Sequence, residues 1–107
     1  MPLTREFKET VQSRLRADRK YGKELLTEGV ACLLAGDLDT GKAILRDYIN
    51  ATIGFEELGR RTKRPAKSLM RMLGPSGNPQ ARNLLEVIQH LQAAEGLHFE
   101  LSLRAAS

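Results

Sequence analysis

The residues best placed to do chemistry in this chain are the basic side chains of its second half. Residues 55–82 hold seven Lys and Arg side chains against two Glu, a local balance of +5, whereas segments 1–54 and 83–107 carry +1 and −2. The seven are Arg60, Arg61, Lys63, Arg64, Lys67, Arg71 and Arg82. A basic block between near-neutral or acidic segments is typical of a surface that binds the phosphates of nucleic acid. The alternative is a helical face whose charges are simply solvated.

A phosphate-binding loop is a competing interpretation for another segment. Residues 36–43 read G-x-x-x-x-G-K-A. Such a loop needs Ser or Thr after its lysine to hold Mg²⁺, but here Ala43 follows Lys42. Asp37 and Asp39 would also stand where phosphate oxygens bind. We therefore interpret the segment as an acidic cap at the start of a helix.

Catalysis and metal binding are not predicted. Neither His90 nor His98 has a nearby Ser or Cys nucleophile with an orienting acid, and one cysteine with two distant histidines does not build a zinc site. We expect no enzyme activity, no cofactor and no metal. The longest apolar run has six residues, far short of the roughly 20 that a membrane helix needs, and residues 1–9 lack the apolar stretch of a secretory signal. We expect a cytoplasmic protein that makes no membrane contact.

The elements that must position the basic block are helices. Apolar residues recur every three or four positions in six segments. The helices are predicted from Thr4 to about Arg16, from a cap at Asp18 to Gly36, from Asp37 or Asp39 to before Gly54, over about 55–62 and 65–73, and from about residue 80 to Glu95. On the second of these helices, the side chains expected to face the core are those of Tyr21, Leu25, Val30, Leu33 and Leu34.

The end of the chain changes period. Apolar residues at 97, 99, 101 and 103 alternate with polar residues at 98, 100, 102 and 104, which predicts one short C-terminal strand. No other segment alternates in this way, so the strand must pair with another chain. We expect a homodimer through this strand; strand addition by a protein partner is the alternative.

Two short helices in the basic block have helix-turn-helix spacing. Gly59 lies where the helices would cross, and such crossings require a small side chain. The inward positions are Leu58, Leu69 and Met72, with Thr62 alongside. The second helix would direct Lys67, Ser68 and Arg71 outward, and these side-chain types contact bases and phosphates in the major groove. The alternative is a plain pair of packed helices.

Several motifs carry a family resemblance. They are Ala-Gly-Asp at 35–37, Phe-Glu-Glu-Leu-Gly at 55–59, Lys-Ser-Leu at 67–69, Gly-Asn-Pro at 77–79 and Leu-Leu-Glu-Val-Ile at 84–88. With them, residues from about 21 to 101 resemble the addiction-module antidote proteins, helix-turn-helix antitoxins related to phage-repressor (Xre-type) regulators. The chain departs from the family in the turn, where Lys63, Arg64 and Pro65 replace the usual Gly, apolar residue and Ser. The resemblance implies a DNA-binding regulator that is often encoded beside a ribosome-dependent RNase toxin of the RelE/HigB type.

The combined prediction is an all-α fold of about six helices with a phage-repressor-like helix-turn-helix and one short C-terminal β-strand. A single domain spans 1–107, with N-terminal helices in 1–53, the helix-turn-helix core in 54–95 and the strand and tail in 96–107. We expect sequence-specific binding of double-stranded operator DNA by a transcriptional regulator, and the resemblance implies the antitoxin of a toxin–antitoxin pair. The alternative is an interaction module that sequesters a partner without specific DNA binding. The expected DNA contacts are Lys63, Arg64, Lys67, Ser68, Arg71, Ser76, Asn78 and Gln80.

Overall fold

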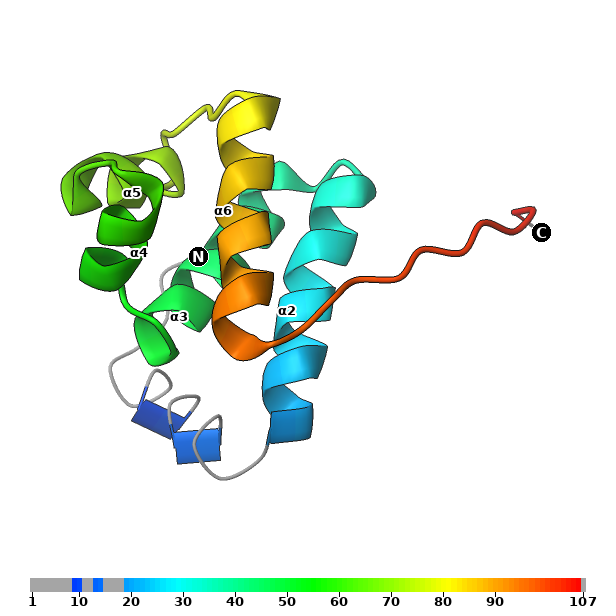
Figure 1. The fold of residues 1–107 in the computed structure, drawn as a ribbon. Helices are drawn as coiled ribbons and strands as arrows, with labels where there is room; N and C mark the ends of the chain where they lie inside the picture. Colours follow the sequence, from blue (N-terminus) through cyan, green and yellow to red (C-terminus); the bar gives the residue numbers. More distant parts are fainter. Residues whose placement is uncertain (1–8, 11–12, 15–18, 107) are drawn as a thin grey trace.

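Helices make up the regular structure of the computed structural model, which describes residues 9–10, 13–14 and 19–106 (Figure 1). Five helices are delimited there: α2 (Arg19–Leu34), α3 (Leu38–Ala51), α4 (Phe55–Thr62), α5 (Ala66–Met72) and α6 (Ala81–Glu95). None of these five is long and apolar enough to cross a membrane. The all-helical prediction is confirmed for this part of the chain. The predicted first helix and the cap at Asp18 lie mainly outside the described residues.

The helix ends follow local capping chemistry. The carboxylate of Asp37 accepts a hydrogen bond from the Thr40 amide at 3.2 Å, which confirms the acidic cap at the start of α3. Helix α4 has its acidic residues in the first turn and its basic residues in the last, as the helix dipole favours. Pro65 caps α5 from outside instead of forming its first residue, so α5 begins one residue later than predicted.

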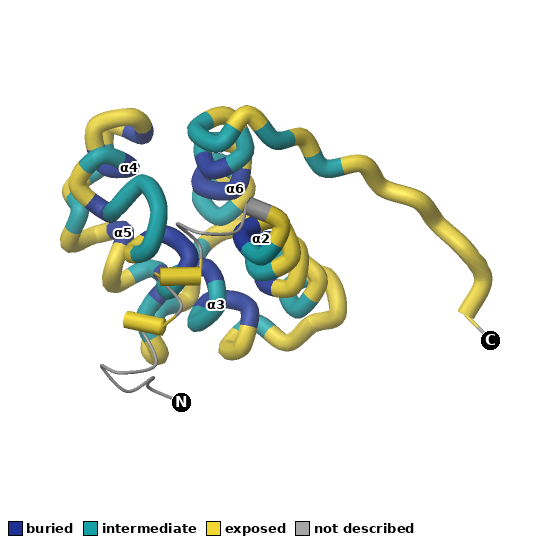
Figure 2. Tube along the Cα trace, turned by 90° about the horizontal axis from the view of Figure 1, so that it is seen from below, coloured by how far each residue is buried: buried dark blue, intermediate teal, exposed yellow. Residues whose placement is uncertain are grey.

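The core lies where α6 meets the other helices. In Figures 1 and 2, α6 stands between α2 on one side and the α4–α5 pair on the other, and α3 passes behind α6 in the view of Figure 1. The buried apolar side chains come from every delimited helix: Leu26, Leu45, Tyr48, Ile49, Phe55, Leu58, Leu69, Leu73, Val87, Ile88 and Leu91.

The face that α2 turns to the core matches the prediction in part, since Leu25, Val30 and Leu33 pack against the core cluster. Leu34 is 73% exposed, while Leu26, outside the predicted face, is 1% exposed. The physical reason is a close approach between α2 and α3 at two glycines. A Cβ on Gly41 would lie 2.6 Å from Leu33 Cδ2 and 3.0 Å from the Gly29 carbonyl oxygen. The contact between α2 and α3 therefore depends on glycines, which have no side chain, and the spacing of apolar residues does not reveal such a contact.

The predicted C-terminal strand is wrong for the single chain. Residues 97–106 have no regular secondary structure and lead away from the helices (Figure 1). Leu97 and Phe99 pack against the core, but Leu101 and Leu103 do not. A strand exists only when its backbone groups pair with a neighbouring strand, and the described part of this chain supplies none.

Tyr48 gives the fold a pH-dependent contribution. Burial, together with the nearby Glu95 carboxylate, raises the pKa of its hydroxyl to about 12. The unfolded chain releases this proton near pH 10, so the folded state holds it more tightly. We expect this contribution to the free energy of unfolding to be full below about pH 10 and to be lost as the pH rises through about 12. Alkaline denaturation followed by circular dichroism should show a steeper loss in the parent chain than in Tyr48→Phe; equal slopes would contradict this.

Candidate nucleic-acid interface

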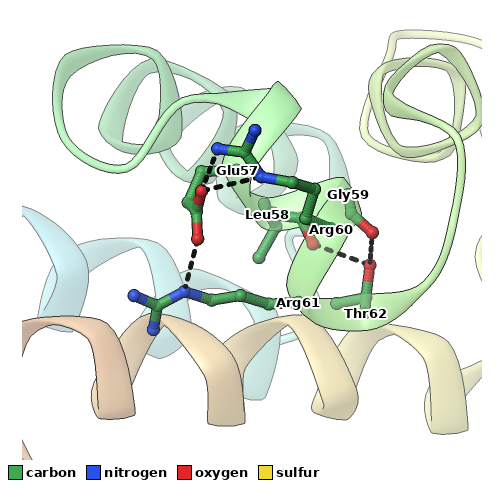
Figure 3. Close-up of polar contacts among 6 residues, drawn as sticks. All are labelled: Glu57, Leu58, Gly59, Arg60, Arg61 and Thr62. Atoms are coloured by element: carbon green, nitrogen blue, oxygen red, sulfur yellow. Dashed lines mark hydrogen bonds and ion pairs between the residues drawn. The ribbon is translucent and has the colours of Figure 1, made fainter.

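Helices α4 and α5 cross closely at Gly59. A Cβ at this position would lie 2.7 Å from the Arg64 carbonyl oxygen and 3.4 Å from the Ala66 amide nitrogen, both backbone atoms. Thr62 is buried beside the crossing, and its hydroxyl donates to the Leu58 carbonyl oxygen at 2.8 Å (Figure 3). Leu58 and Leu69 are fully buried and Met72 is half-buried. The small residue expected at the crossing and the inward residues around it are therefore confirmed.

The turn between the two helices contains a strained lysine. Lys63 has φ 58° and ψ 40°, and no other non-glycine residue in the described ranges has a positive φ. The Arg64 amide donates to the Gly59 carbonyl oxygen at 3.0 Å and closes the end of α4. A residue with a Cβ adopts this left-handed conformation at a cost of about 1–2 kcal/mol. The turn thus keeps a conformation that glycine would adopt freely, and it presents an exposed cation there.

Arg64 ties the turn to α6. Its Nη2 donates to Asn83 Oδ1 at 2.8 Å and lies 3.2 Å from Glu86 Oε2. The side chain is about one third exposed, so the pair lies at the edge of the core. A phosphate contact by Arg64, as expected from the sequence, would have to compete with this ion pair.

Ion pairs divide the basic block into two groups. Arg60 and Arg61 both bind the carboxylate of Glu57 (Figure 3), and their hydrogen bonds hold its pKa below the usual value. Arg64 is paired with Glu86. The remaining four cations are exposed and form no ion pair with any described residue: Lys63, Lys67, Arg71 and Arg82. The uncompensated positive charge is thus carried by the turn, α5 and the first turn of α6.

A groove of about 530 Å³ adjoins α5 and brings most of the predicted contacts together. Six of the eight predicted residues line it: Arg64, Ser68, Arg71, Ser76, Asn78 and Gln80. Lys63 and Lys67 are exposed but are not among the lining residues. Asn83, in the first turn of α6, joins the lining and was not predicted. The arrangement combines one unpaired cation, Arg71, with hydroxyl and amide groups and a helix N-terminus in one depression.

Two cations of α3, which the sequence interpretation missed, hold the loop that borders this groove. Lys42 is 2% exposed, and its ammonium donates to the carbonyl oxygens of Gly74 at 3.0 Å and Gly77 at 2.6 Å. Arg46 Nη1 donates to the Leu73 carbonyl oxygen at 2.7 Å. These carbonyls lie just beyond the C-terminal end of α5, where the helix dipole favours positive charge.

A signal for Lys42 does exist in the sequence. The residue precedes Leu45 by three positions and Ile49 by seven, so it lies on the inward stripe of α3. A lysine at such a position must be buried with partners or reach past the core to solvent. The sequence interpretation of residues 36–43 considered Lys42 only as the lysine of a phosphate-binding loop, and it did not predict that this side chain is buried.

Comparison with known proteins assigns nothing further. No family model, no curated protein and no solved structure matches the chain. The functional argument therefore rests on the residues of this chain and their geometry.

Proposed function

We propose that the protein is a sequence-specific DNA-binding transcriptional regulator in which α4, the turn and α5 act as a helix-turn-helix. The observation that carries this proposal is the outer face of α5. Lys67, Ser68 and Arg71 are exposed there, and neither cation is neutralised by a described carboxylate. Arginine and lysine bind guanine edges in the major groove, and serine bonds to any base. A short exposed helix with this composition is suited to enter that groove.

The loop before α6 supports the proposal as a phosphate-binding border. Ser76, Asn78 and Gln80 face the groove beside α5. The first turn of α6 has no acidic residue, and the Gln80 side chain makes no capping bond, so the amide donors of this turn are not covered by a side chain. Arg82 adds an exposed cation at the same helix end. A helix N-terminus with these neighbours favours a DNA phosphate, which fixes the register of the reading helix.

The direct test is selection from a pool of random duplexes, followed by fluorescence anisotropy over a salt series. Four uncompensated cations per chain predict a slope of log K against log salt of about −2 to −4, according to how many contact phosphate. A selected motif bound with this slope supports the proposal. Failure to retain any duplex at low salt, or an affinity that ignores salt, would overturn it.

The variant Lys63→Gly removes the positive charge of the turn without destabilising its backbone conformation. Glycine adopts the left-handed turn without strain, so we expect the free energy of unfolding to stay the same or rise by up to about 1 kcal/mol. Loss of one phosphate contact should reduce the salt slope by about 1 and weaken all duplexes alike. Thermal denaturation and the salt series measure the two effects. An unchanged slope would remove Lys63 from the interface.

The resemblance of residues 21–101 extends the proposal to a cytoplasmic antitoxin of a RelE/HigB-type toxin. Leu34 and Leu85 are large apolar side chains that are 73% and 64% exposed, so a protein partner could bury them on binding. Co-expression with the product of the neighbouring reading frame tests this role by co-purification and by relief of growth arrest. Partner binding without salt-dependent retention on duplex DNA would favour the module that only sequesters.

A further inference from the structure

The C-terminal tail, defined here as residues 97–106, is anchored at its start and uncovered beyond. The Leu97 amide donates to the Gln92 carbonyl oxygen at 2.8 Å, and the Phe99 amide donates to Gln92 Oε1 at 2.7 Å. After Phe99 no hydrogen bond ties the tail to any described residue. Leu101 is 83% exposed and Leu103 101%, and Figure 2 shows this part of the tail exposed throughout. The tail is thus an extended segment with an open backbone and two uncovered leucines.

We propose that the tails of two copies of this chain pair as antiparallel strands centred on Ser102. The partner is a second copy because the tail is complementary to itself in charge. In this register Glu100 lies opposite Arg104 of the second copy, and Leu101 lies opposite Leu103 of the second copy. The two-fold axis through the centre repeats both pairs, so a short ribbon gains two ion pairs and two leucine pairs.

The alternation of the tail excludes half of the other registers. A shift by one residue on the partner strand places apolar side chains opposite polar ones on the same face. Registers that keep the faces matched differ in charge. A centre at Leu101 sets His98 opposite Arg104, a centre at Glu100 sets that carboxylate opposite itself, and a centre at Leu103 leaves Glu100 opposite Ala106. Among these, the centre at Ser102 is the one that brings opposite charges together.

The same register continues the core of each copy along the ribbon. Phe99, which packs against the core cluster, lies opposite Ala105 of the second copy, a small residue that leaves room for the ring. Leu101 and Leu103 extend this apolar face beyond the helices. Pairing therefore covers the exposed leucines and the open backbone in one step. The inference does not depend on DNA binding, although a two-fold dimer also suits an operator with two half-sites.

Charge exchange in the full chain tests the register without DNA, by sedimentation equilibrium. Glu100→Arg and Arg104→Glu each turn two attractive pairs into two repulsive ones, so each should weaken dimerisation about tenfold or more. The double variant Glu100→Arg/Arg104→Glu restores opposite charges and should dimerise as the parent chain does. A mixture of the two single variants should form mixed dimers in preference to either self-dimer.

The control is Glu24→Arg, the same charge reversal at an exposed position of α2, which should leave dimerisation unchanged. Circular dichroism checks that each variant folds, which is expected because positions 100 and 104 are exposed. A parent chain that stays monomeric at high micromolar concentration would overturn the proposal. So would single variants that dimerise as tightly as the parent chain, or a double variant no tighter than the singles.

Discussion

Replacing Gly77 with alanine is expected to lower the free energy of unfolding by about 3 kcal/mol, at the upper end of the usual cost of overpacking. The backbone of Gly77 has no positive φ, so the reason is space. An added Cβ would lie 2.8 Å from the Met72 carbonyl carbon and closer still to the carbonyl oxygens of Arg71 and Met72. These atoms belong to the end of α5, and the Gly77 carbonyl oxygen is itself held by Lys42. The loop cannot retreat without losing that bond.

Thermal denaturation measures the effect of Gly77→Ala, and for a domain of this size about 3 kcal/mol corresponds to a fall of about 12–24 °C in Tm. The matched control is Gly74→Ala in the same loop. There the nearest atom to an added Cβ is the Met70 carbonyl oxygen at 3.2 Å, a tight contact that a small shift relieves. We expect the control to lose less than a third as much stability. Equal losses at both positions would show that the loop does not press on α5 at Gly77.

Removing Arg71 is expected to reduce affinity for the selected duplex about 5- to 150-fold, which corresponds to about 1–3 kcal/mol. Arg71 is exposed on α5, lines the groove and has no described carboxylate partner. A guanidinium in this position can bond to two acceptors of one guanine, so Arg71→Ala should also relax the preference at one base position. Competition binding with duplexes substituted at single positions measures both effects.

Lys67→Ala should behave in the same way as Arg71→Ala, or as a uniform loss if Lys67 binds phosphate. The matched control is Lys23→Ala on α2, a helix that lies on the opposite side of α6 from α5 in Figures 1 and 2. Lys23 is exposed, so the control removes the same charge without touching the proposed interface. If Lys23→Ala weakened DNA binding as much as Lys67→Ala, Lys67 would contribute only through the overall positive charge of the protein and not through a direct contact with DNA.

The sequence predicted correctly those features that follow from the spacing and type of nearby side chains. The bounds of α4, the crossing at Gly59 and the outward position of Lys67, Ser68 and Arg71 all follow from apolar spacing, and the structure agrees. Capping chemistry was equally local, as the bond from Asp37 to the start of α3 shows. Each of these features depends on residues within about twenty positions of one another.

The features that were not predicted depend on contacts between residues far apart in the sequence or on glycines, which have no side chain. The α2–α3 contact is made at Gly29 and Gly41, which carry no side chain for a pattern to count. Lys42 meets its acceptors 32 and 35 residues later, on backbone carbonyls that every sequence has. The tail alternates as a strand does, but whether it becomes one depends on a second chain. The pairing of Arg64 with Asn83 and Glu86 likewise required the packed helices to be known.

The hydrogen bonds from α3 to the segment after α5 determine whether α5 can unfold locally. Helix α5 has seven residues, too few to be stable alone in water. Lys42 and Arg46 hold the carbonyls of the segment that directly follows it, at Leu73, Gly74 and Gly77, so opening the end of α5 exposes a buried ammonium whose acceptors are gone. Helix α5 is thereby coupled to α3 and would not unfold by local fraying. We therefore expect that segment 54–95 does not form a separate cooperative unit, and that the surface proposed to read DNA becomes ordered only when α3 has docked.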